Sequence, residues 1–231
     1  TMSDGDNLQF DEDRIRQIWD EPDRGKVPIN WSISPMLINV APAMYTYYQR
    51  TQTANDLLIA GPSGAGYTYP GDWPTISMLE SYAERTAELM KRGGLDIIYI
   101  LNRIESTDIP LSDPVAETYL RYLPRLRGIL YNGLLYSKVS VSAGELPVIN
   151  QPWNITSVST AQSAVKTATA GWDGRSPMFV AIQPIIAAMD TTDVVNFVES
   201  LGSEYAVVRG DVFFNLLRQH LRLPGIHPGQ R

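Results

Sequence analysis

The chain has 231 residues, with 19 Lys and Arg against 25 Asp and Glu, so its formal net charge is −6. Apolar residues make up 44% and charged residues 19%, which is a globular composition rather than that of a disordered chain. The excess of acidic residues argues against a protein that binds nucleic-acid phosphates. The sequence contains no run of about 18 apolar residues that would predict a membrane span. The lack of Cys excludes disulfides, thiolate zinc sites and Cys nucleophiles. Only two residues are His, and both lie near the C-terminus, which disfavours a multi-histidine metal centre or a His-dependent triad.

The first residues, Thr1 to Asn7, read like the end of a strand that enters a polar turn. They have neither the charged nor the apolar region of a signal peptide. We therefore expect the chain to begin inside a structural element and to be a C-terminal piece of a longer multidomain protein.

Short apolar runs then alternate with amphipathic stretches along the rest of the chain. The runs are bounded by Gly, Pro, Asn or Asp and predict buried strands at residues 27–33, 56–60, 96–101, 128–131, 146–149, 178–182 and 205–208. Apolar spacings of three and four predict helices at residues 11–19, 35–48, 75–92, 113–123, 158–170, 191–201 and 211–221. The irregular stretch 134–144 is expected to be a long loop.

With the strand ending near Ser3, this pattern gives eight strands separated by helices. Eight units of about 29 residues predict a single (β/α)8 TIM-like barrel over residues 1–231, with its first strand truncated at the N-terminus. An open doubly wound sheet is the alternative. No Rossmann glycine fingerprint follows a strand, and no cofactor is expected.

A barrel enzyme carries its site at the carboxyl ends of its strands. Polar residues follow nearly every predicted strand, and a list in chain order runs Asp4, Asp6 and Asn7; Trp31 and Ser34; Ser63; Asn102 and Glu105; Asn132; Asn150 and Gln151; Gln183; Arg209 and Asp211. Loops are polar in most proteins, so the individual residues decide what the pattern means.

Four carboxylates are candidates for acid–base chemistry. Asp4 and Asp6 are two residues apart, so an extended backbone directs both to one side, where one pKa rises or a cation binds. The same residues are also typical of a surface turn. Glu105 and Asp211 each follow a predicted strand, although Glu105 also suits a solvated loop and Asp211 the cap of the last helix.

Two arginines are candidates for substrate binding. Arg24 precedes a predicted strand and is either a substrate clamp or a surface charge. Arg209 follows a predicted strand, where it would orient a carboxylate or a substrate oxygen.

The loop at residues 61–73 combines glycines with aromatic rings. Its glycines allow a close approach of the backbone to a ligand, and its rings offer stacking surfaces for a sugar. The polar and aromatic candidates are Ser63, Tyr67, Tyr69 and Trp73. The loop lacks the Gly-Lys-Ser/Thr ending of a phosphate loop, and the alternative is an aromatic loop that packs against its own barrel.

The run Gly64-Ala65-Gly66-Tyr67-Thr68-Tyr69-Pro70 resembles the signature of the GxGYxYP family of glycoside hydrolases. Further stretches resemble the C-terminal domain of that family: residues 3–7, 24–35, 55–56, 208–211 and 213–214. Gly210 stands where the resemblance leads us to expect Pro. The resemblance covers essentially the whole chain and implies a barrel-like domain preceded by further domains.

The same resemblance implies carbohydrate processing in a bacterial protein that is secreted, periplasmic or on the cell surface. It supplies no catalytic residues. The leading hypothesis is hydrolysis of a poly- or oligosaccharide by paired carboxylates, with Asp6 and Glu105 preferred over Asp4 and Asp211. The substrate-binding candidates are Asn7, Arg24, Trp31, Ser63, Tyr67, Tyr69, Trp73, Asn102, Gln183 and Arg209, with no metal ligand.

Because the first and eighth strands of a barrel are neighbours, Asp4, Asp6, Arg209 and Asp211 are expected to cluster, with Glu105 across the mouth. A wide gap between the carboxylates would favour inversion of configuration. The alternatives are a glycan-binding domain without catalysis, and a metal-assisted carbohydrate esterase or deacetylase that uses Asp4 and Asp6.

Overall fold

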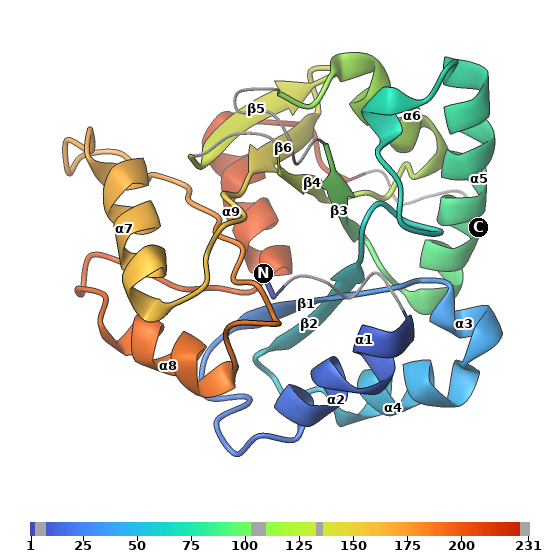
Figure 1. The fold of residues 1–231 in the computed structure, drawn as a ribbon. Helices are drawn as coiled ribbons and strands as arrows, with labels where there is room; N and C mark the ends of the chain where they lie inside the picture. Colours follow the sequence, from blue (N-terminus) through green and yellow to red (C-terminus); the bar gives the residue numbers. More distant parts are fainter. Residues whose placement is uncertain (3–7, 103–109, 133–135, 227–231) are drawn as a thin grey trace.

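A computed structural model describes residues 1–2, 8–102, 110–132 and 136–226. Within this part of the chain, one mixed sheet has the strand order β1-β2-β3-β4-β6-β5 (Figure 1). The strands are β1 (Ile29–Ile33), β2 (Asp56–Ala60), β3 (Ile97–Leu101), β4 (Gly128–Asn132), β5 (Lys138–Ser142) and β6 (Leu146–Asn150). All neighbours pair in parallel except β5, which runs antiparallel to β6.

Helices separate most of the strands, as the sequence predicts. They are α1 (Leu8–Glu12), α2 (Arg14–Trp19), α3 (Leu37–Val40), α4 (Pro42–Thr51), α5 (Ile76–Gly93), α6 (Asp113–Tyr122), α7 (Val158–Thr169), α8 (Thr191–Glu199) and α9 (Gly210–Leu221). The short 3-10 helix η1 (Pro70–Asp72) lies in the glycine–tyrosine loop. The stretch 134–144, expected to be a loop, contains β5 instead.

The closed eight-stranded barrel is not confirmed, because the sheet stays open in the described residues. Residues 178–182 and 205–208 form no strand there, and five strands run parallel. Outside the pairing of these six strands, the described residues form two isolated parallel bridges, Met2 with Trp31 and Ile155 with Pro184. The fold is therefore a mixed α/β domain with a mostly parallel six-stranded sheet.

Single hydrogen bonds nevertheless connect the two ends of the sheet. The Thr1 nitrogen donates to the Ile182 carbonyl at 3.0 Å, and the Gln183 amide donates to the Pro152 carbonyl at 3.2 Å. We call the contact of Thr1 and residues 152–155 with residues 182–185 the seam. Pro152 and Pro184 each lack an N–H, so a continuous ladder of backbone hydrogen bonds cannot form along this seam.

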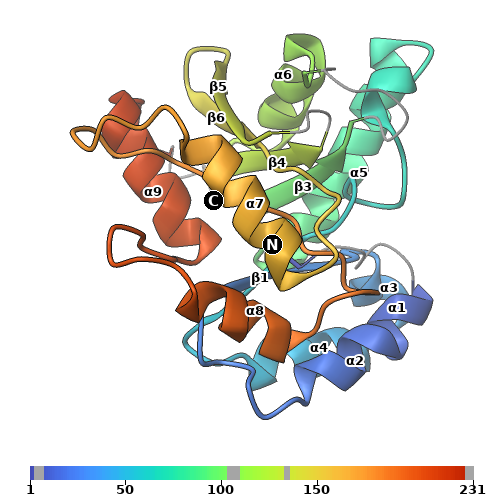
Figure 2. The same cartoon turned by 60° about the vertical axis from the view of Figure 1, so that its left-hand side comes forward.

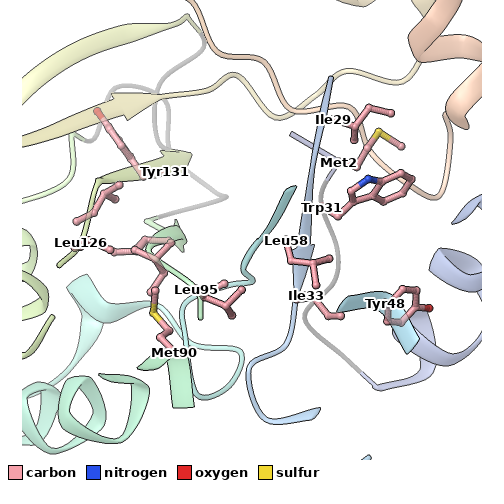
Figure 3. Packing of buried hydrophobic residues seen from close by; sticks show 14 of the residues in the cluster. Met2, Ile29, Trp31, Ile33, Tyr48, Leu58, Met90, Leu95, Leu126 and Tyr131 are labelled. Atoms are coloured by element: carbon pink, nitrogen blue, oxygen red, sulfur yellow. The ribbon is translucent and has the colours of Figure 1, made fainter. Parts of the chain in front are cut away.

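One face of the sheet packs under helices of the first half of the chain. Trp31, Ile98 and Tyr131 lie on this face, in a core shared with buried residues of α2, α4, α5 and α6 (Figure 3). Alternation of side chains along each strand explains the choice of residues, since every second one points to the same side. The helix α8 also contributes Val194 and Val195 to this core, and it packs against α7 (Figure 2).

The opposite face packs against α9. Ile59, Ile97, Leu130 and Ile149 form a second cluster with Phe214 and other residues of that helix. The ends of α9 show where it lies: the Gly210 amide donates to the Asn30 side chain at 2.7 Å, next to the start of β1. At the other end of the helix, the Arg218 guanidinium donates to the carbonyls of residues 126, 127 and 145, just before β4 and β6. The helix α9 therefore crosses the amino ends of the strands.

Candidate functional site

The sheet face that packs against α9 is apolar in its middle and becomes polar towards the carboxyl ends of the strands. Leu130 is followed two residues later by Asn132, and Ile149 by Gln151, so an extended backbone directs each pair to one side. Among the described residues, the buried polar side chains near these ends are neutral: Ser32, Ser34, Ser63, Asn102, Asn132, Asn150, Gln151 and Gln183. Amides and hydroxyls both donate and accept hydrogen bonds, which suits a neutral polar ligand.

Two of these groups, Gln151 and Gln183, form a buried chain of hydrogen bonds with the Tyr99 hydroxyl. The Gln183 Nε2 donates to the Tyr99 hydroxyl at 2.8 Å, and the Gln151 Nε2 donates to the Gln183 Oε1 at 3.4 Å. The Gln151 side chain is fully buried, and its Oε1 has no hydrogen-bond partner among the described residues. An unpaired buried carbonyl is costly, so this oxygen favours a hydroxyl donor from a ligand or from water.

The glycine–tyrosine loop lies at the same end of the sheet. The Gly61 amide donates to the Ile33 carbonyl at 2.8 Å, which extends the pairing of β1 and β2. The Ser63 hydroxyl accepts from the Leu101 amide at 2.9 Å and donates to the Thr68 carbonyl at 2.8 Å. Ser63 is therefore fully buried and holds the loop against β3. The location agrees with the sequence prediction, while the role of the loop in binding stays a prediction.

Two further contacts fix the shape of this loop. Gly64 has a φ of +126°, and a Cβ there would overlap the Thr86 side chain, so the position requires glycine. The Tyr82 hydroxyl accepts from the Gly66 amide at 2.9 Å and donates to the Gly66 carbonyl. Burial raises the pKa of Tyr82 to about 12, so the hydroxyl keeps its proton at neutral pH.

The aromatic rings of the loop face outward to different degrees. Tyr67 is 52% exposed, and its hydroxyl lies 3.1 Å from the hydroxyl of half-buried Tyr69. Trp73 is half-buried, and its indole N–H donates to the Thr68 hydroxyl at 2.8 Å. The Asn102 side chain borders the loop, because a Cβ on Gly71 would lie 3.6 Å from its Oδ1. The structure thus brings Ser63, Tyr67, Tyr69, Trp73 and Asn102 to one end of the sheet.

Trp31 and Arg24 lie elsewhere, in the core. Trp31 is 1% exposed, its N–H donates to Asp56 Oδ1 at 2.8 Å, and its ring meets Trp19 edge to face at 5.1 Å. The Arg24 guanidinium pairs with Asp56 Oδ2 and lies 4.4 Å above the Trp19 ring. Asp56 begins β2, so this cluster is at the amino ends of the strands. Trp31 has no free face for a sugar, and Arg24 is engaged by the protein itself.

Arg209 and Asp211 also lie at the amino ends, not at the predicted mouth. Arg209 donates to the Ala54 carbonyl at 2.7 Å, before β2, and pairs with Asp211 at 2.8 Å. No strand forms at residues 205–208 to carry them to the other end, and Asp211 lies in the first turn of α9 rather than at its cap. Partial burial raises the pKa of Asp211, but the hydrogen bonds and charge of Arg209 outweigh it and hold the pKa below its ordinary value. A carboxyl group with a lowered pKa is a poor general acid.

The candidates Asp4, Asp6, Asn7 and Glu105 lie outside the described residues. Their described neighbours in the sequence are Met2, which pairs with Trp31 beside β1, and Asn102, which directly follows β3.

Sequence reasoning noted Gln151 after a predicted strand but did not select it for substrate binding, and it missed Tyr99. The signal for Gln151 was its spacing of two from buried Ile149, which places both on one face. It also missed Asp11, a fully buried aspartate whose carbonyl accepts from the Tyr48 hydroxyl. The spacing of Asp11 from Ile15 and Ile18 already placed it on the apolar face of its helix.

Two further properties concern the described residues as a whole. They contain no group of three or more His, Asp or Glu side chains that could hold a metal ion. No helix in this part of the chain is both long and apolar enough to cross a membrane.

The fold and the polar end of its sheet define a mostly parallel α/β domain with its candidate site at the carboxyl ends of the strands. The sequence matches the family described as "GxGYxYP putative glycoside hydrolase C-terminal domain" over residues 1–218. The chain belongs to this family. None of the curated proteins compared with the chain matches it.

Two solved structures are similar to this domain. One is described as a "putative hydrolase" from Bacteroides thetaiotaomicron, with 25% sequence identity and a TM-score of 0.83 over 95% of this chain and 44% of that chain. The other is described as a "putative polysaccharide deacetylase" from Mycobacterium smegmatis, with 8% identity and a TM-score of 0.57 over 94% of this chain and 81% of that chain. The second likeness concerns the fold alone. The chain spans less than half the length of the Bacteroides protein.

Proposed function

We propose that this domain hydrolyses O-glycosidic bonds of a poly- or oligosaccharide at the carboxyl ends of its parallel strands. The observation that carries the proposal is the buried, neutral set of amides and hydroxyls at that end, in a chain of a glycoside hydrolase family. The unpaired Gln151 Oε1 offers an acceptor for a sugar hydroxyl. A ligand that is rich in hydroxyls and carries no charge satisfies such groups without an ion pair.

The chemistry needs one carboxylic acid to protonate the leaving oxygen and one carboxylate as base or nucleophile. We assign these roles to Asp6 and Glu105, with Asp4 as the next candidate. Asp211 is not part of the proposal, because it pairs with Arg209 at the amino ends of the strands.

Two wider features belong to the same proposal. We infer that the domain works beside N-terminal domains and outside the cytoplasm. The Bacteroides hydrolase, of which the match covers 44%, supports the first of these.

The test is a panel of glycans incubated with the protein, in which binding and newly formed reducing ends are both measured. Asp6→Asn and Glu105→Gln should each lower hydrolysis by about 100-fold or more while leaving binding in place, since the amide keeps the shape and loses the proton chemistry. Glu84→Gln, which changes an exposed carboxylate on α5, is the control and should hydrolyse like wild type.

A second variant tests the binding role of the amides. Gln151→Met keeps the approximate size of the side chain and removes both its acceptor and its donor to Gln183, so it should weaken glycan binding, and circular dichroism establishes that the variant is folded. Binding of glycans without any release of reducing ends would instead identify a glycan-binding domain. Wild-type hydrolysis by Asp6→Asn would remove Asp6 from the mechanism.

A further inference from the structure

An open groove borders the glycine–tyrosine loop on its outer side. Its lining residues come from the loop, η1 and the first turn of α5, and they are Thr68, Tyr69, Asp72, Trp73, Pro74 and Met78. We call this set the loop groove. Its volume is about 380 Å³, within the range of small-ligand sites. Met78 is 49% exposed, and Tyr67 beside the groove is 52% exposed, so apolar surface is open to solvent here.

We propose that the loop groove is an outer subsite that binds one neutral pyranose unit of a longer glycan. The inference rests on the proposed function and extends it, because it assigns the binding of a further sugar unit of the substrate to a particular set of residues outside the amide-lined site.

The chemistry of the lining favours a neutral sugar. The Tyr69 and Trp73 rings and the Met78 thioether offer an apolar surface for the C–H face of a pyranose. Asp72 is the charged residue among those that line the groove, and its carboxylate accepts hydrogen bonds from sugar hydroxyls. A negative charge without a cation in the lining disfavours a phosphate or an acidic sugar.

The rings are held in place before any ligand arrives. The Trp73 indole N–H donates to the Thr68 hydroxyl at 2.8 Å, and the ring lies 5.3 Å from Tyr82. The Tyr69 ring meets Tyr67 edge to face at 5.8 Å. Side chains that are already ordered lose little conformational freedom on binding, which favours affinity.

The groove also lies next to residues that border the proposed site. Tyr69 lines the groove and packs against the cluster of Ile97, Tyr99 and Leu101 on the inner face of the sheet. Gly71, between Tyr69 and Trp73, borders the Asn102 side chain at the end of β3. Under this proposal, a glycan with one unit at the amide-lined site extends a neighbouring unit into the groove.

The test compares the affinity of short and long saccharides. Gluco-, manno- and xylo-oligosaccharides with β-1,4 linkages, and gluco-oligosaccharides with α-1,4 linkages, are titrated at two and six units by calorimetry. We expect wild type to bind one six-unit probe about tenfold more tightly than its two-unit form, the usual size of one added aromatic contact. Trp73→Ala should abolish this difference, so that the six-unit probe binds no more tightly than its two-unit form.

Matched controls separate the groove from general effects on folding. Trp172→Ala removes another exposed tryptophan, 41% exposed and outside the groove, and should keep the length dependence. Met78→Ala changes a largely exposed side chain and should reduce the length dependence in part. Circular dichroism and the thermal midpoint establish that each variant is folded.

Length-dependent binding that needs Trp73, with no hydrolysis of any probe, supports the subsite while the proposed hydrolase function fails. Hydrolysis with the same length dependence in Trp73→Ala as in wild type overturns the subsite and leaves the hydrolase function standing. The absence of binding by every probe also overturns the subsite. Self-association that is lost in Trp73→Ala would assign the groove to a second copy of the chain and overturn it as well.

Discussion

At the scale of single residues, a buried carboxylate explains why an aromatic candidate for sugar binding is a core residue. Asp56 accepts from the Trp31 indole, from the Thr53 amide at 2.8 Å and from the Arg24 guanidinium. The sequence showed Trp31 on a strand and Asp56 at the start of the next one. It could not show that parallel pairing sets Trp31 near Asp56, since that contact depends on the register of β1 and β2.

We expect Asp56→Ala to lower the free energy of unfolding by about 3 to 5 kcal/mol, because it leaves Arg24 and the Trp31 N–H without their partner. Urea denaturation followed by tryptophan fluorescence measures the change. Glu84→Ala, at an exposed position of α5, is the control and should stay within about 0.5 kcal/mol of wild type. A loss below about 1 kcal/mol in Asp56→Ala would show that this cluster contributes little.

Asp211 gives a prediction about pH. Its pKa in the folded protein is below the ordinary value of 3.8, so the carboxylate stabilises the fold above that pH, and this contribution disappears as the pH falls through the folded pKa. We therefore expect Asp211→Asn to be less stable than wild type at neutral pH and to approach it below about pH 4. Urea midpoints measured from pH 7 to pH 3 test this. A difference that stays constant over the whole range would contradict it.

At the scale of helices and strands, the sequence predicted elements better than it predicted pairing. Apolar runs located β1, β2, β3, β4 and β6 to within two residues at each end. The runs 178–182 and 205–208 have the same composition but form no strand. Strand formation there depends on partners: prolines interrupt the first seam, and Val207 of the second run is 36% exposed. The composition of the two runs shows neither the interrupted pairing nor the exposure of Val207.

The helix α9 gives a prediction at this scale. Gly128, at the start of β4, faces the Phe214 ring so closely that an added Cβ would overlap it. We expect Gly128→Ala to displace the ring and to cost about 1 to 3 kcal/mol of folding free energy.

Gly171 provides the matched control for this change, because an added Cβ meets open space there. Gly171→Ala should leave the unfolding free energy within about 0.5 kcal/mol of wild type. Equal effects of the two substitutions would show that Phe214 does not pack against Gly128 as described.

At the scale of the whole molecule, the chain combines a net charge of −6 with a candidate site whose described buried polar groups are neutral. Composition alone had excluded phosphate-rich partners, and the glycine–tyrosine motif had pointed to the family. The amide-lined end of the sheet could be predicted from the sequence only in part. Its residues Gln151, Gln183 and Tyr99 lie far apart in the sequence and come together through the fold.

Binding of an uncharged glycan by uncharged groups predicts how the affinity depends on salt concentration. We expect the affinity for a bound glycan to change less than about twofold between roughly 50 and 500 mM NaCl, since screening acts on charged pairs. Calorimetric titrations at several salt concentrations measure this. A steep fall in affinity with salt would indicate a charged ligand and contradict neutral recognition.

The seam that joins the two ends of the sheet sets the order in which backbone amides become accessible to solvent deuterons. Strands β3 and β4 share five consecutive residue pairs, whereas Gln183 and Ile185 are tied by one backbone bond each to residues 152 and 155. Such isolated bonds open without the cooperative loss of a ladder, so these amides exchange before those of β3 and β4. Because Gln183 also supplies its side chain to the amide cluster, a bound sugar would slow exchange most at the seam.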